Sequence, residues 1–515
     1  MLDLSTILAG FGDAFNLVNL FFVLAGVTLG QLIGAVPGIG PVMAMAVAIP
    51  FTFGMNALPA IAFLVGVNKG GLVGGAVPAV LINTPGTPDA AATALDGHAL
   101  ARQGKPEKAM KMALFSSVTG DTFSDIVLIT VSPLLAVLAL KMGPIEIFAL
   151  MILAFSVLAG LIGDSIPKGI IAAAAGLLCA MVGLEPEHGT PRLFFGYFEL
   201  YDGLPLPSVA IGMLAISEIL RRLATSRSGM GATIEFKETG DPADRRVSFV
   251  EYWACRFTML RGAVIGTFLG ALPGIGSTAA AFMSYASAKQ TSDDPESFGK
   301  GNLHGIAAAE SANSAVVGAN LIPLLTLGIP GSVSAALIIS AFIIHGIQPG
   351  PLLFHQQGRL IYGLFGAMLM ANVMNLLVGQ FGLRLWTRVI KAPESVIFSA
   401  AILLCIVGVS MASGGLFGVA VMLVFAGLGY VMTTYGYPVV VFIIAFFLGP
   451  RFEVSLAQSL TLTRGNLFAL QHNPIALVLL VCAVASIWWM GVAAPKRQQR
   501  RAAARAAEAE KDFTD

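Results

Sequence analysis

The sequence predicts an all-α polytopic membrane protein made of two inverted-topology repeats, with broken helices, re-entrant Pro-Gly hairpins and about 10–12 spans. Hydrophobic residues make up 56% of the 515 residues and charged residues only 11%, whereas soluble proteins carry roughly a quarter charged residues. The chain also holds 58 glycines and 27 prolines, which at membrane depth indicate close packing or broken helices that line a cavity. A soluble enzyme is therefore excluded. The balance of 30 basic against 29 acidic residues gives no nucleic-acid-binding surface.

Several apolar stretches are long enough for a spanning helix, which needs about 20 mostly apolar residues. They lie near 15–34, 113–140, 145–163, 166–184, 204–220, 257–273, 360–383, 394–411, 415–433 and 473–493. A further apolar run at 436–449 is shorter. Two regions rich in glycine, proline and small residues, 35–100 and 271–350, do not divide into clean spans. We expect short or interrupted helices there, with hairpins that enter the membrane and return.

Basic residues favour the cytoplasm, and they cluster at 102–111, 221–261, 384–391 and in the tail. The 185–202 loop is acidic, which predicts an external position. These assignments place the N-terminus in the periplasm and the C-terminus in the cytoplasm. The N-terminal stretch lacks a basic region, so we expect no cleavable signal peptide. The expected domains are a first transmembrane repeat (1–220), a cytoplasmic basic linker (221–250), a second transmembrane repeat (251–450), a periplasmic loop with the final span (451–494) and a cytoplasmic basic tail (495–515).

An internal duplication follows from motifs that recur in the same order. GAVPGIG at 34–40 returns as GALPGIG at 270–276, and PAVLINTPG at 78–86 aligns with PLLTLGIPG at 323–331. In the register of this second pair of motifs, Asn68 matches Asn313. The span after Lys111 starts inside and its counterpart near Arg359 starts outside, so the halves are predicted to be inverted. Inverted repeats are typical of secondary transporters, in which substrate binds near the midplane between broken helices.

The Pro-Gly turns are the first candidates for a substrate site. Broken helix ends offer free backbone N–H groups and a positive dipole, which suit a carboxylate; ordinary tight loops between spans are the alternative. Lys69 stands apart from other charges and could pair with an anionic substrate, with a carboxylate such as Asp89, or reach the interface from a helix end. The candidate substrate-binding residues are Pro37, Gly38, Gly40, Asn68, Lys69, Asn83, Thr84, Pro85, Gly86, Thr87, Pro273, Gly274, Gly276, Ser277, Asn313, Pro330, Gly331 and Ser332.

Ionisable residues inside a membrane are costly and mark functional sites by default. Glu310 lies in a compact polar group and could coordinate Na⁺ or carry a proton; a helix-capping network is the alternative. Asp121 and Asp125 are four residues apart and share one helix face. Asp96-Gly97-His98 is predicted to be a turn. The candidate ion-coupling residues are Asp89, Asp121, Asp125, Glu310, Ser311 and Ser314.

Signatures of enzymes and bound metals are absent from the sequence. There is no G-x-x-x-x-G-K-[ST] motif for ATP and no H-E-x-x-H metal motif. Thr119-Gly120-Asp121 resembles an intramembrane aspartyl protease motif, but Val118 stands where that motif needs glycine. The four cysteines are widely spaced and are expected to be buried and free. We therefore predict no catalytic residues, no metal site and no cofactor other than Na⁺ or H⁺ as coupling ion.

Several stretches together resemble the large permease subunit of tripartite tricarboxylate transporters, the TctA family. They are GAVPGIGP, NTPGTP and ALDGHALARQGKP in the first half, and GALPGIGSTAAAFMSYASAK, FGKGNLHGIAAAESANSA and LIPLLTLGIPGSVSAAL with HGIQPGPLLF in the second. The resemblance covers roughly residues 15–490. It implies a multi-pass secondary transporter of the bacterial inner membrane, which takes up di- and tricarboxylates and other organic acids by symport. Its partners would be a small membrane subunit and a periplasmic solute-binding protein.

The chain departs from the family pattern near the expected site. Val67-Asn68-Lys69-Gly70 replaces a Tyr-Tyr-Gly pattern, and Ala308-Ala309-Glu310 replaces Ala-Pro-Glu. Relative to the family pattern, this chain loses a hydroxyl and gains a cation near the expected site. The substrate is therefore not fixed as citrate, and another organic anion is compatible with these residues. Three alternatives remain open: a self-sufficient organic-anion carrier, a membrane-embedded enzyme and a passive channel.

Overall fold

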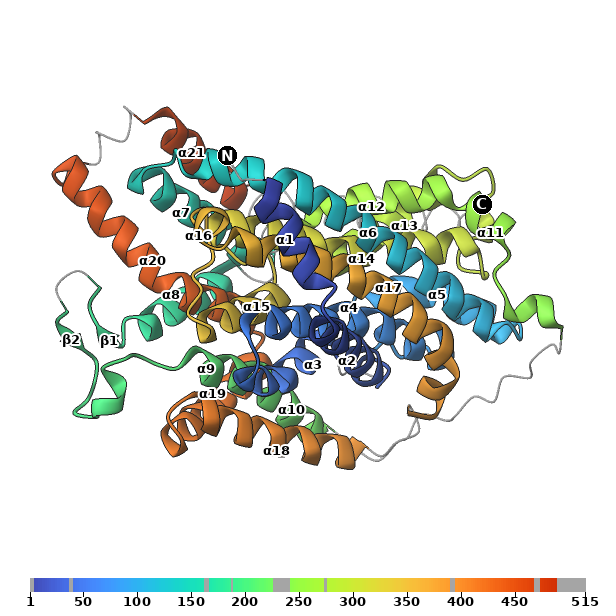
Figure 1. The fold of residues 1–515 in the computed structure, drawn as a ribbon, viewed down its shortest axis with the longest axis horizontal. Coiled ribbons are helices and arrows are strands. Elements are labelled where there is room, and N and C mark those ends of the chain that lie inside the picture. The colour runs from blue at the N-terminus through green and yellow to red at the C-terminus, as the bar shows by residue number, and fades with distance from the viewer. Residues whose placement is uncertain are drawn as a thin grey trace, which may run out of the picture. The chain divides into compact units, whose positions relative to one another are not determined.

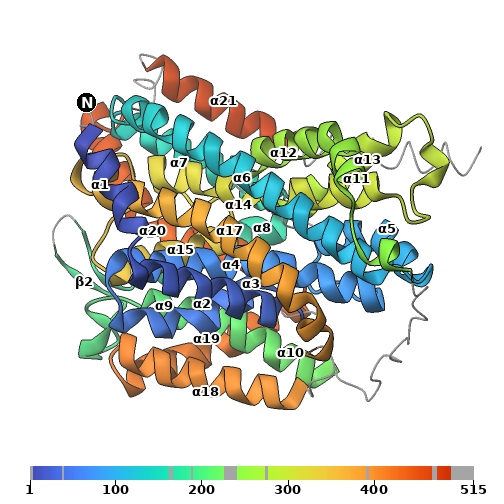
Figure 2. The same ribbon diagram turned by 45° about the vertical axis from the view of Figure 1, so that its right-hand side comes forward.

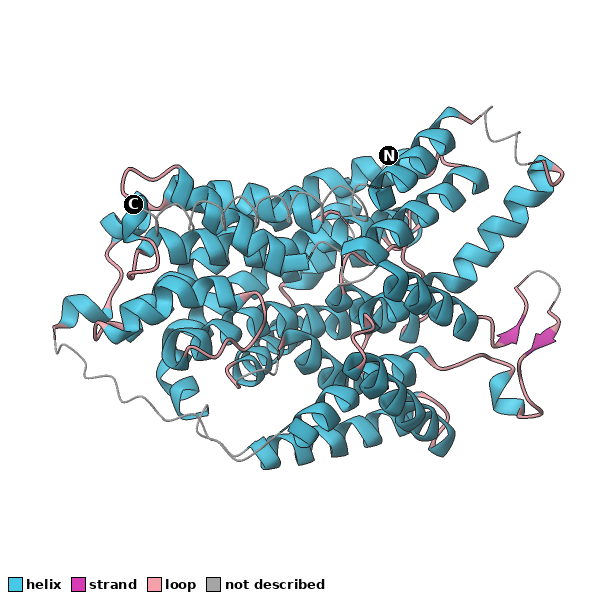
Figure 3. Cartoon of the chain, turned by 180° about the vertical axis from the view of Figure 1, so that it is seen from behind, coloured by secondary structure: helices cyan, strands magenta, loops and turns pink. Residues whose placement is uncertain are grey.

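The computed structural model describes residues 4–36, 40–161, 166–186, 189–225, 241–272, 276–389, 394–466 and 473–488. Within these ranges the chain is helical except for one short hairpin and the connecting loops (Figure 3). The predicted all-α class is therefore confirmed. The contacts divide the chain into two units: Met1–Leu140 with Leu204–Val431, and Lys141–Gly203 with the chain from Met432 onward.

The first unit contains most of the helices (Figure 1). In chain order its α-helices are α1 (Leu4–Ala14), α2 (Leu17–Gly34), α3 (Pro41–Ala48), α4 (Ala57–Ile82), α5 (Ala90–Arg102), α6 (Pro106–Ala139), α9 (Leu206–Ile211), α10 (Ser217–Thr225), α11 (Phe249–Ala254), α12 (Arg256–Gly270), α13 (Gly276–Gln290), α14 (Leu303–Leu327), α15 (Val333–Ile344), α16 (Leu353–Gln356), α17 (Gly358–Val389), α18 (Glu394–Ala412) and α19 (Leu416–Thr434). Its other short helices are η1 (Ile49–Gly54), the π-helix η3 (Gly212–Ile216), η4 (Pro242–Arg245) and η5 (Pro295–Ser297).

The second unit contains α7 (Pro144–Leu161), α8 (Ile166–Ala180), η2 (Phe198–Leu200), α20 (Val439–Thr463) and α21 (Pro474–Trp488). Its hairpin pairs β1 (Gly183–Leu184) antiparallel with β2 (Pro191–Arg192). A paired Arg192 and Glu453 link this hairpin to α20, with Nη1 to Oε1 at 2.6 Å and Nη2 to Oε2 at 2.9 Å. Such a bidentate geometry fixes the direction of approach as well as adding binding energy.

Six described helices are long and apolar enough to cross a membrane: α2, α4, α6, α17, α19 and α20. Shorter apolar helices occupy most of the other predicted spans. The expected short run at 436–449 is wrong, because α20 continues through Pro450 to Thr463. The boundary expected after residue 450 therefore falls inside a helix. The total of about 10–12 spans stays a prediction.

The two glycine-rich regions contain long helices that the sequence analysis did not expect. Instead of interrupted segments, α4 runs for 26 residues and α14 for 25, each with one proline inside. Glycine is a poor helix former in water, but here it allows two helix backbones to touch. The stability gained from this close packing compensates for the low helix propensity of glycine. The short helices α3 and α15 do fit the expectation of short helices in these regions.

The same close packing occurs in both halves of the chain. In the first half, a Cβ added to Gly30 would lie 2.2 Å from the carbonyl oxygen of Val67 on α4. In the second half, a Cβ on Gly266 would lie 2.2 Å from the carbonyl oxygen of Ala312 on α14. The full matching series is Gly26, Gly30 and Gly34 against Phe63, Val67 and Gly71, and Gly262, Gly266 and Gly270 against Ala308, Ala312 and Val316. The α2–α4 and α12–α14 pairs are therefore built alike, which supports the duplication.

The ends of the two long helices also match. Asn83 caps α4 with a left-handed backbone (φ 52°), and Gly328 caps α14 in the same way (φ 71°). Glycine adopts this conformation without strain, and asparagine is among the few other residues that tolerate it. After each cap the chain passes through a Pro-Gly loop into a shorter helix, α5 or α15.

Long helices from both halves pack against each other inside the first unit (Figure 2). α6 of the first half packs on α14, and α17 of the second half packs on α4. The shorter helices follow the same rule, since α5 contacts α13 and α15 contacts α3. The middle of this unit is therefore shared by both halves, and it is where the candidate site lies.

One pH-dependent contact lies outside the candidate spans, at the start of α11. Burial alone would raise the pKa of the Glu251 carboxyl, but the Lys108 ammonium and hydrogen bonds from Ser248 hold it below its usual 4.5. A lowered folded pKa contributes stability above the unfolded pKa, and this is lost as pH falls through the folded value. We expect Glu251→Gln to lower the melting temperature at neutral pH and the gap to wild type to close as pH falls below the usual carboxyl pKa of 4.5. Glu296→Gln, at an exposed site, is the control; a gap that widens in acid would refute this account.

Candidate functional site

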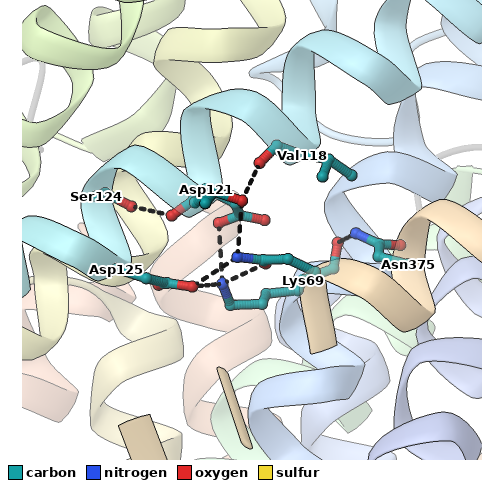
Figure 4. A network of polar contacts seen from close by, with 8 residues as sticks. Lys69, Val118, Asp121, Ser124, Asp125 and Asn375 are labelled. Carbon is teal, nitrogen blue, oxygen red and sulfur yellow. Dashed lines mark hydrogen bonds and ion pairs between the residues drawn. The ribbon is translucent and has the colours of Figure 1, made fainter. Parts of the chain in front are cut away.

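Lys69 lies in the middle of α4, and its side chain is completely buried. Its Nζ is 2.6 Å from Oδ2 of Asp125 and 3.4 Å from Oδ1 of Asp121. Both aspartates belong to α6 and are at most 1% exposed. Figure 4 shows the ammonium reaching from α4 toward the two carboxylates, which stand one helical turn apart. The expected sharing of one helix face is thus what lets both aspartates meet one lysine.

Two asparagines of α17 complete the surroundings of this lysine. The Oδ1 of Asn372 accepts a hydrogen bond from Lys69 Nζ at 2.8 Å, while its Nδ2 donates to Asp125 at 2.8 Å. Asn375 donates to the backbone carbonyl of Lys69 at 3.3 Å and accepts from Gln31 of α2. We call Lys69, Asp121, Asp125 and Asn372 the charge cluster. It joins α4 and α6 of the first half to α17 of the second.

The charge cluster has one ammonium for two carboxylates. Among the described residues, Lys69 is also the one buried lysine or arginine, whereas Asp89, Asp96, Asp121, Asp125 and Glu310 are all buried. An ion taken out of water costs several kcal/mol unless it is paired. Within the described part of the chain, the interior of the first unit therefore holds more acidic side chains than basic ones.

Glu310 forms a second polar group, at the place where α14 packs against α5 and α6. Its carboxylate accepts from Ser117 of α6 at 2.7 Å and from Thr93 of α5 at 2.5 Å. Ser311 follows it and donates to the carbonyl of Ala308 at 3.4 Å. Glu310 is therefore held between helices and does not cap one. Two hydroxyl groups and one carboxylate, from three different helices, meet at this point.

Asp89 stands at the start of α5, in the loop that follows the first Pro-Gly turn. It accepts a hydrogen bond from Thr278 in the first turn of α13. Lys69 therefore pairs with Asp121 and Asp125, and Asp89 has a different partner. This contact also brings the first-half loop to the start of α13, where Gly276 and Ser277 lie.

Polar atoms without hydrogen bonds gather on α14 next to these groups. Both amide atoms of Asn313 and the hydroxyl of Ser314 are buried and have no hydrogen-bond partner in the described structure. Leaving a buried polar atom unsatisfied costs about 1–3 kcal/mol. Such atoms indicate that water or an ion belongs at this position.

Each Pro-Gly loop packs closely against residues of its own half of the chain. The backbone N–H of Gly86 donates to Gly75 at 3.3 Å, and Gly40 lies against Thr87. In the second half Ser332 caps α15 and accepts from Asn320 at 3.0 Å. The described loop residues are buried or partly buried except for Asn83, Thr84 and Pro88, which are exposed.

The predicted site residues thus fall into three places in the structure. One group lies in or beside the two loops: Gly40, Asn83, Thr84, Pro85, Gly86, Thr87, Asp89, Gly276, Ser277, Pro330, Gly331 and Ser332. A second lies on α4 and α6: Asn68, Lys69, Asp121 and Asp125. A third lies on α14: Glu310, Ser311, Asn313 and Ser314. Pro37, Gly38, Pro273 and Gly274 lie outside the described residues.

Asp96 has a structural role that the sequence analysis missed. The predicted turn at 96–98 is wrong, because these residues belong to α5. One carboxylate oxygen accepts backbone hydrogen bonds from Gly299, Gly301 and Asn302 at 2.8–2.9 Å, and the other accepts from Tyr285 at 2.8 Å. Asp96 therefore clamps the loop between α13 and α14 to α5.

Removing this clamp is expected to release that loop. Asp96→Ala deletes four hydrogen bonds to a charged acceptor, each worth about 1.5–3 kcal/mol. Hydrogen exchange of residues 292–302 should become at least about tenfold faster, while exchange in α20 stays as in the wild type. Asp202→Ala, in the loop of the other unit, is the control. Unchanged exchange at 292–302 would show that the clamp does not hold the loop.

Sequence reasoning also missed Asn372, Asn375, Gln31, Thr93, Ser117 and Thr278. A signal was present for the two asparagines, because they are three residues apart inside an apolar span and so share a helix face. The hydroxyl residues gave no comparable signal. Serine and threonine often satisfy themselves on their own helix and need no partner elsewhere.

Comparison with known proteins identifies the family. A family model described as "Tripartite tricarboxylate transporter TctA family" matches residues 20–444. The chain belongs to this family. It is 34% identical over 498 residues to an Agrobacterium vitis protein described as an uncharacterised 52.8 kDa protein in the TAR-I ttuC′ 3′ region, covering 95% of this chain and 96% of that protein. A second A. vitis protein, from the TAR-II ttuC′ 3′ region, is 35% identical over 226 residues, which are 43% of this chain and 93% of that protein. No solved structure matches the TctA chain.

Proposed function

We propose that this TctA protein is the large membrane subunit of a binding-protein-dependent importer, which takes up di- or tricarboxylate-like organic acids by symport with Na⁺ or H⁺. The family supports the tripartite transporter assignment. The observation that carries the coupling is the surplus of buried carboxylates over Lys69 in the first unit. Buried negative charge needs a compensating proton or cation, so binding a cation inside the bundle would neutralise it.

The two Pro-Gly loops are the proposed anion site. Each follows a long helix with a left-handed cap and leads into a shorter helix, and the two are matched between the halves. Backbone N–H groups at such helix starts suit a carboxylate. Asn83, Thr84, Thr87 and Ser332 would add side-chain donors. The matched α2–α4 and α12–α14 packing supports two repeats of one unit, and we propose that they are inverted as in other secondary transporters.

Asp121, Asp125 and Glu310 are the proposed coupling groups. They lie where α6 meets α4 and α14, so a cation bound there would contact both halves of the chain. Movement of one half against the other would then depend on the charge of this seam. The proposed setting is the bacterial inner membrane, with the N-terminus in the periplasm and the C-terminus in the cytoplasm.

The partner requirement is tested by uptake into cells. Cells that make this chain with a small membrane subunit and a periplasmic binding protein of the same system are given labelled di- and tricarboxylates. We expect accumulation that disappears when either partner is omitted. Accumulation by the chain alone would show a self-sufficient carrier, and failure with every organic acid in the complete system would refute the proposed substrate class.

A further inference from the structure

The ammonium of Lys69 is surrounded by oxygen atoms in the way that a bound metal cation is. Asp125 Oδ2 lies at 2.6 Å, Asn372 Oδ1 at 2.8 Å and Asp121 Oδ1 at 3.4 Å from Nζ. Carboxylate and amide oxygens are the ligands that hard cations prefer. The side chain is fully buried. These oxygens therefore form a cation site whose occupant is attached to the chain.

The duplication shows what stands at the same place in the second half. Gly30 packs on Val67 in the first half, and Gly266 packs on Ala312 in the second. This pairing aligns α4 with α14, so that Lys69, two residues after Val67, matches Ser314, two residues after Ala312. The second half thus has a short hydroxyl where the first half has an ammonium.

The position of Ser314 needs a partner that the described residues do not supply. Along α14, Ser311 lies against Gly120 of α6, and Gly318 lies against Asp125. Ser314 is between them at helical spacing, so it lies on the face of α14 that packs against α6, the helix that carries Asp121. The hydroxyl of Ser314 has no hydrogen-bond partner, and the Asp121 oxygens have none apart from the ion pair with Lys69. A mobile cation bound between α14 and α6 would give a partner both to the Ser314 hydroxyl and to the Asp121 carboxylate.

We propose that Lys69 is a tethered cation: its ammonium permanently fills, in the first repeat, the position that a mobile monovalent cation takes beside Ser314 in the second repeat. The role of Ser314 rests on the proposed cation coupling, whereas the role of Lys69 does not. The consequence is that this chain moves one mobile cation fewer per cycle than a chain with both positions open. Vacating the Lys69 position should create a new site for a mobile cation.

The test is the thermal stability of the purified full-length protein in different salts at constant ionic strength. Lys69→Ala removes the ammonium and leaves both space and two carboxylates. Melting temperatures are measured in sodium, potassium and methylammonium chloride and compared with choline chloride, whose cation is too large. We expect at least one small cation to raise the melting temperature of Lys69→Ala by about 3 °C or more beyond its effect on the wild type.

Lys69→Met is the matched control. It removes the charge but keeps most of the side-chain volume, so a mobile cation has no room to enter. It should be destabilised in every salt and gain nothing beyond the wild-type response. A gain in Lys69→Met equal to that of Lys69→Ala would overturn the proposal, because the salt would then act elsewhere.

A second variant tests the proposal in case Lys69→Ala alone folds poorly. Lys69→Ala combined with Asp121→Asn keeps the net charge of the wild-type cluster and should still gain stability from a small cation. If neither variant gains more than the wild type from any of the three cations, or if neither folds in any salt while Lys69→Arg does, the proposal is wrong. The assay needs no substrate and no partner subunit, so a failed uptake experiment would count against the proposed function alone.

Discussion

Replacing Asp121 and Asp125 together by asparagine is expected to abolish uptake and to destabilise the protein by about 3–5 kcal/mol. The double change leaves the buried ammonium of Lys69 without a carboxylate, and an uncompensated charge in an apolar interior is among the costliest of single defects. The amount of folded protein in the membrane and its melting temperature measure the loss of stability. Uptake per folded molecule measures the loss of transport.

Two further variants separate folding from coupling. Adding Lys69→Met removes the last charge of the cluster and should restore much of the stability, since replacing a whole buried ion pair by neutral groups is often tolerated. Transport should remain absent, because the coupling carboxylates are gone. Asp13→Asn is the surface control: it breaks an exposed pair with Arg359, which is worth at most about 1 kcal/mol. A triple variant that transports like the wild type would show that the cluster only supports the fold.

The second large effect concerns the contacts between glycine-rich helices. Gly30→Ala and Gly266→Ala each place a methyl group about 2.2 Å from a backbone carbonyl oxygen, on α4 and α14 respectively. Backbone cannot move aside as a flexible side chain can, so the paired helices must separate. We expect each change to cost more than about 2 kcal/mol and to lower the folded amount of protein, with similar losses for the two sites.

The controls are glycines in helices with free space around them. A Cβ at Gly12 or Gly427 meets nothing within 4 Å. Alanine at these positions should leave stability unchanged or raise it by up to about 1 kcal/mol, because alanine favours the helix. If Gly30→Ala and Gly266→Ala behave like these two, the close approach of the helices is wrong. If only one of them is harmful, the halves are not built alike.

Much of the fold follows from sequence because apolar length and repeated motifs are local signals. The segment 15–34 predicted α2 to within two residues at its start, and the GAVPGIG and GALPGIG motifs revealed that Gly34 and Gly270 have matching places. The long helices α4 and α14 could not be predicted in this way. Their glycines lower helix propensity, and only the close contact with α2 and α12 makes up for it.

The candidate site shows the same limit. Lys69, Asp121 and Asp125 could be singled out because a charge inside an apolar stretch is visible in the sequence. Which groups meet is a property of packing. Asn372 lies about 300 residues from Lys69 along the chain, so nothing local connects them. Asp96 was misplaced for a related reason, since the Gly-His sequence after it resembles a turn and its partners on the 299–302 loop come from the other half.

The measurement that tests the central claim most directly is accumulation of a labelled organic acid in the complete system, with the sodium and proton gradients collapsed separately. We predict accumulation above the external concentration that is lost when one of the two gradients is removed and that survives depletion of ATP. Accumulation that persists without either gradient, or mere equilibration across the membrane, would contradict a cation-coupled importer.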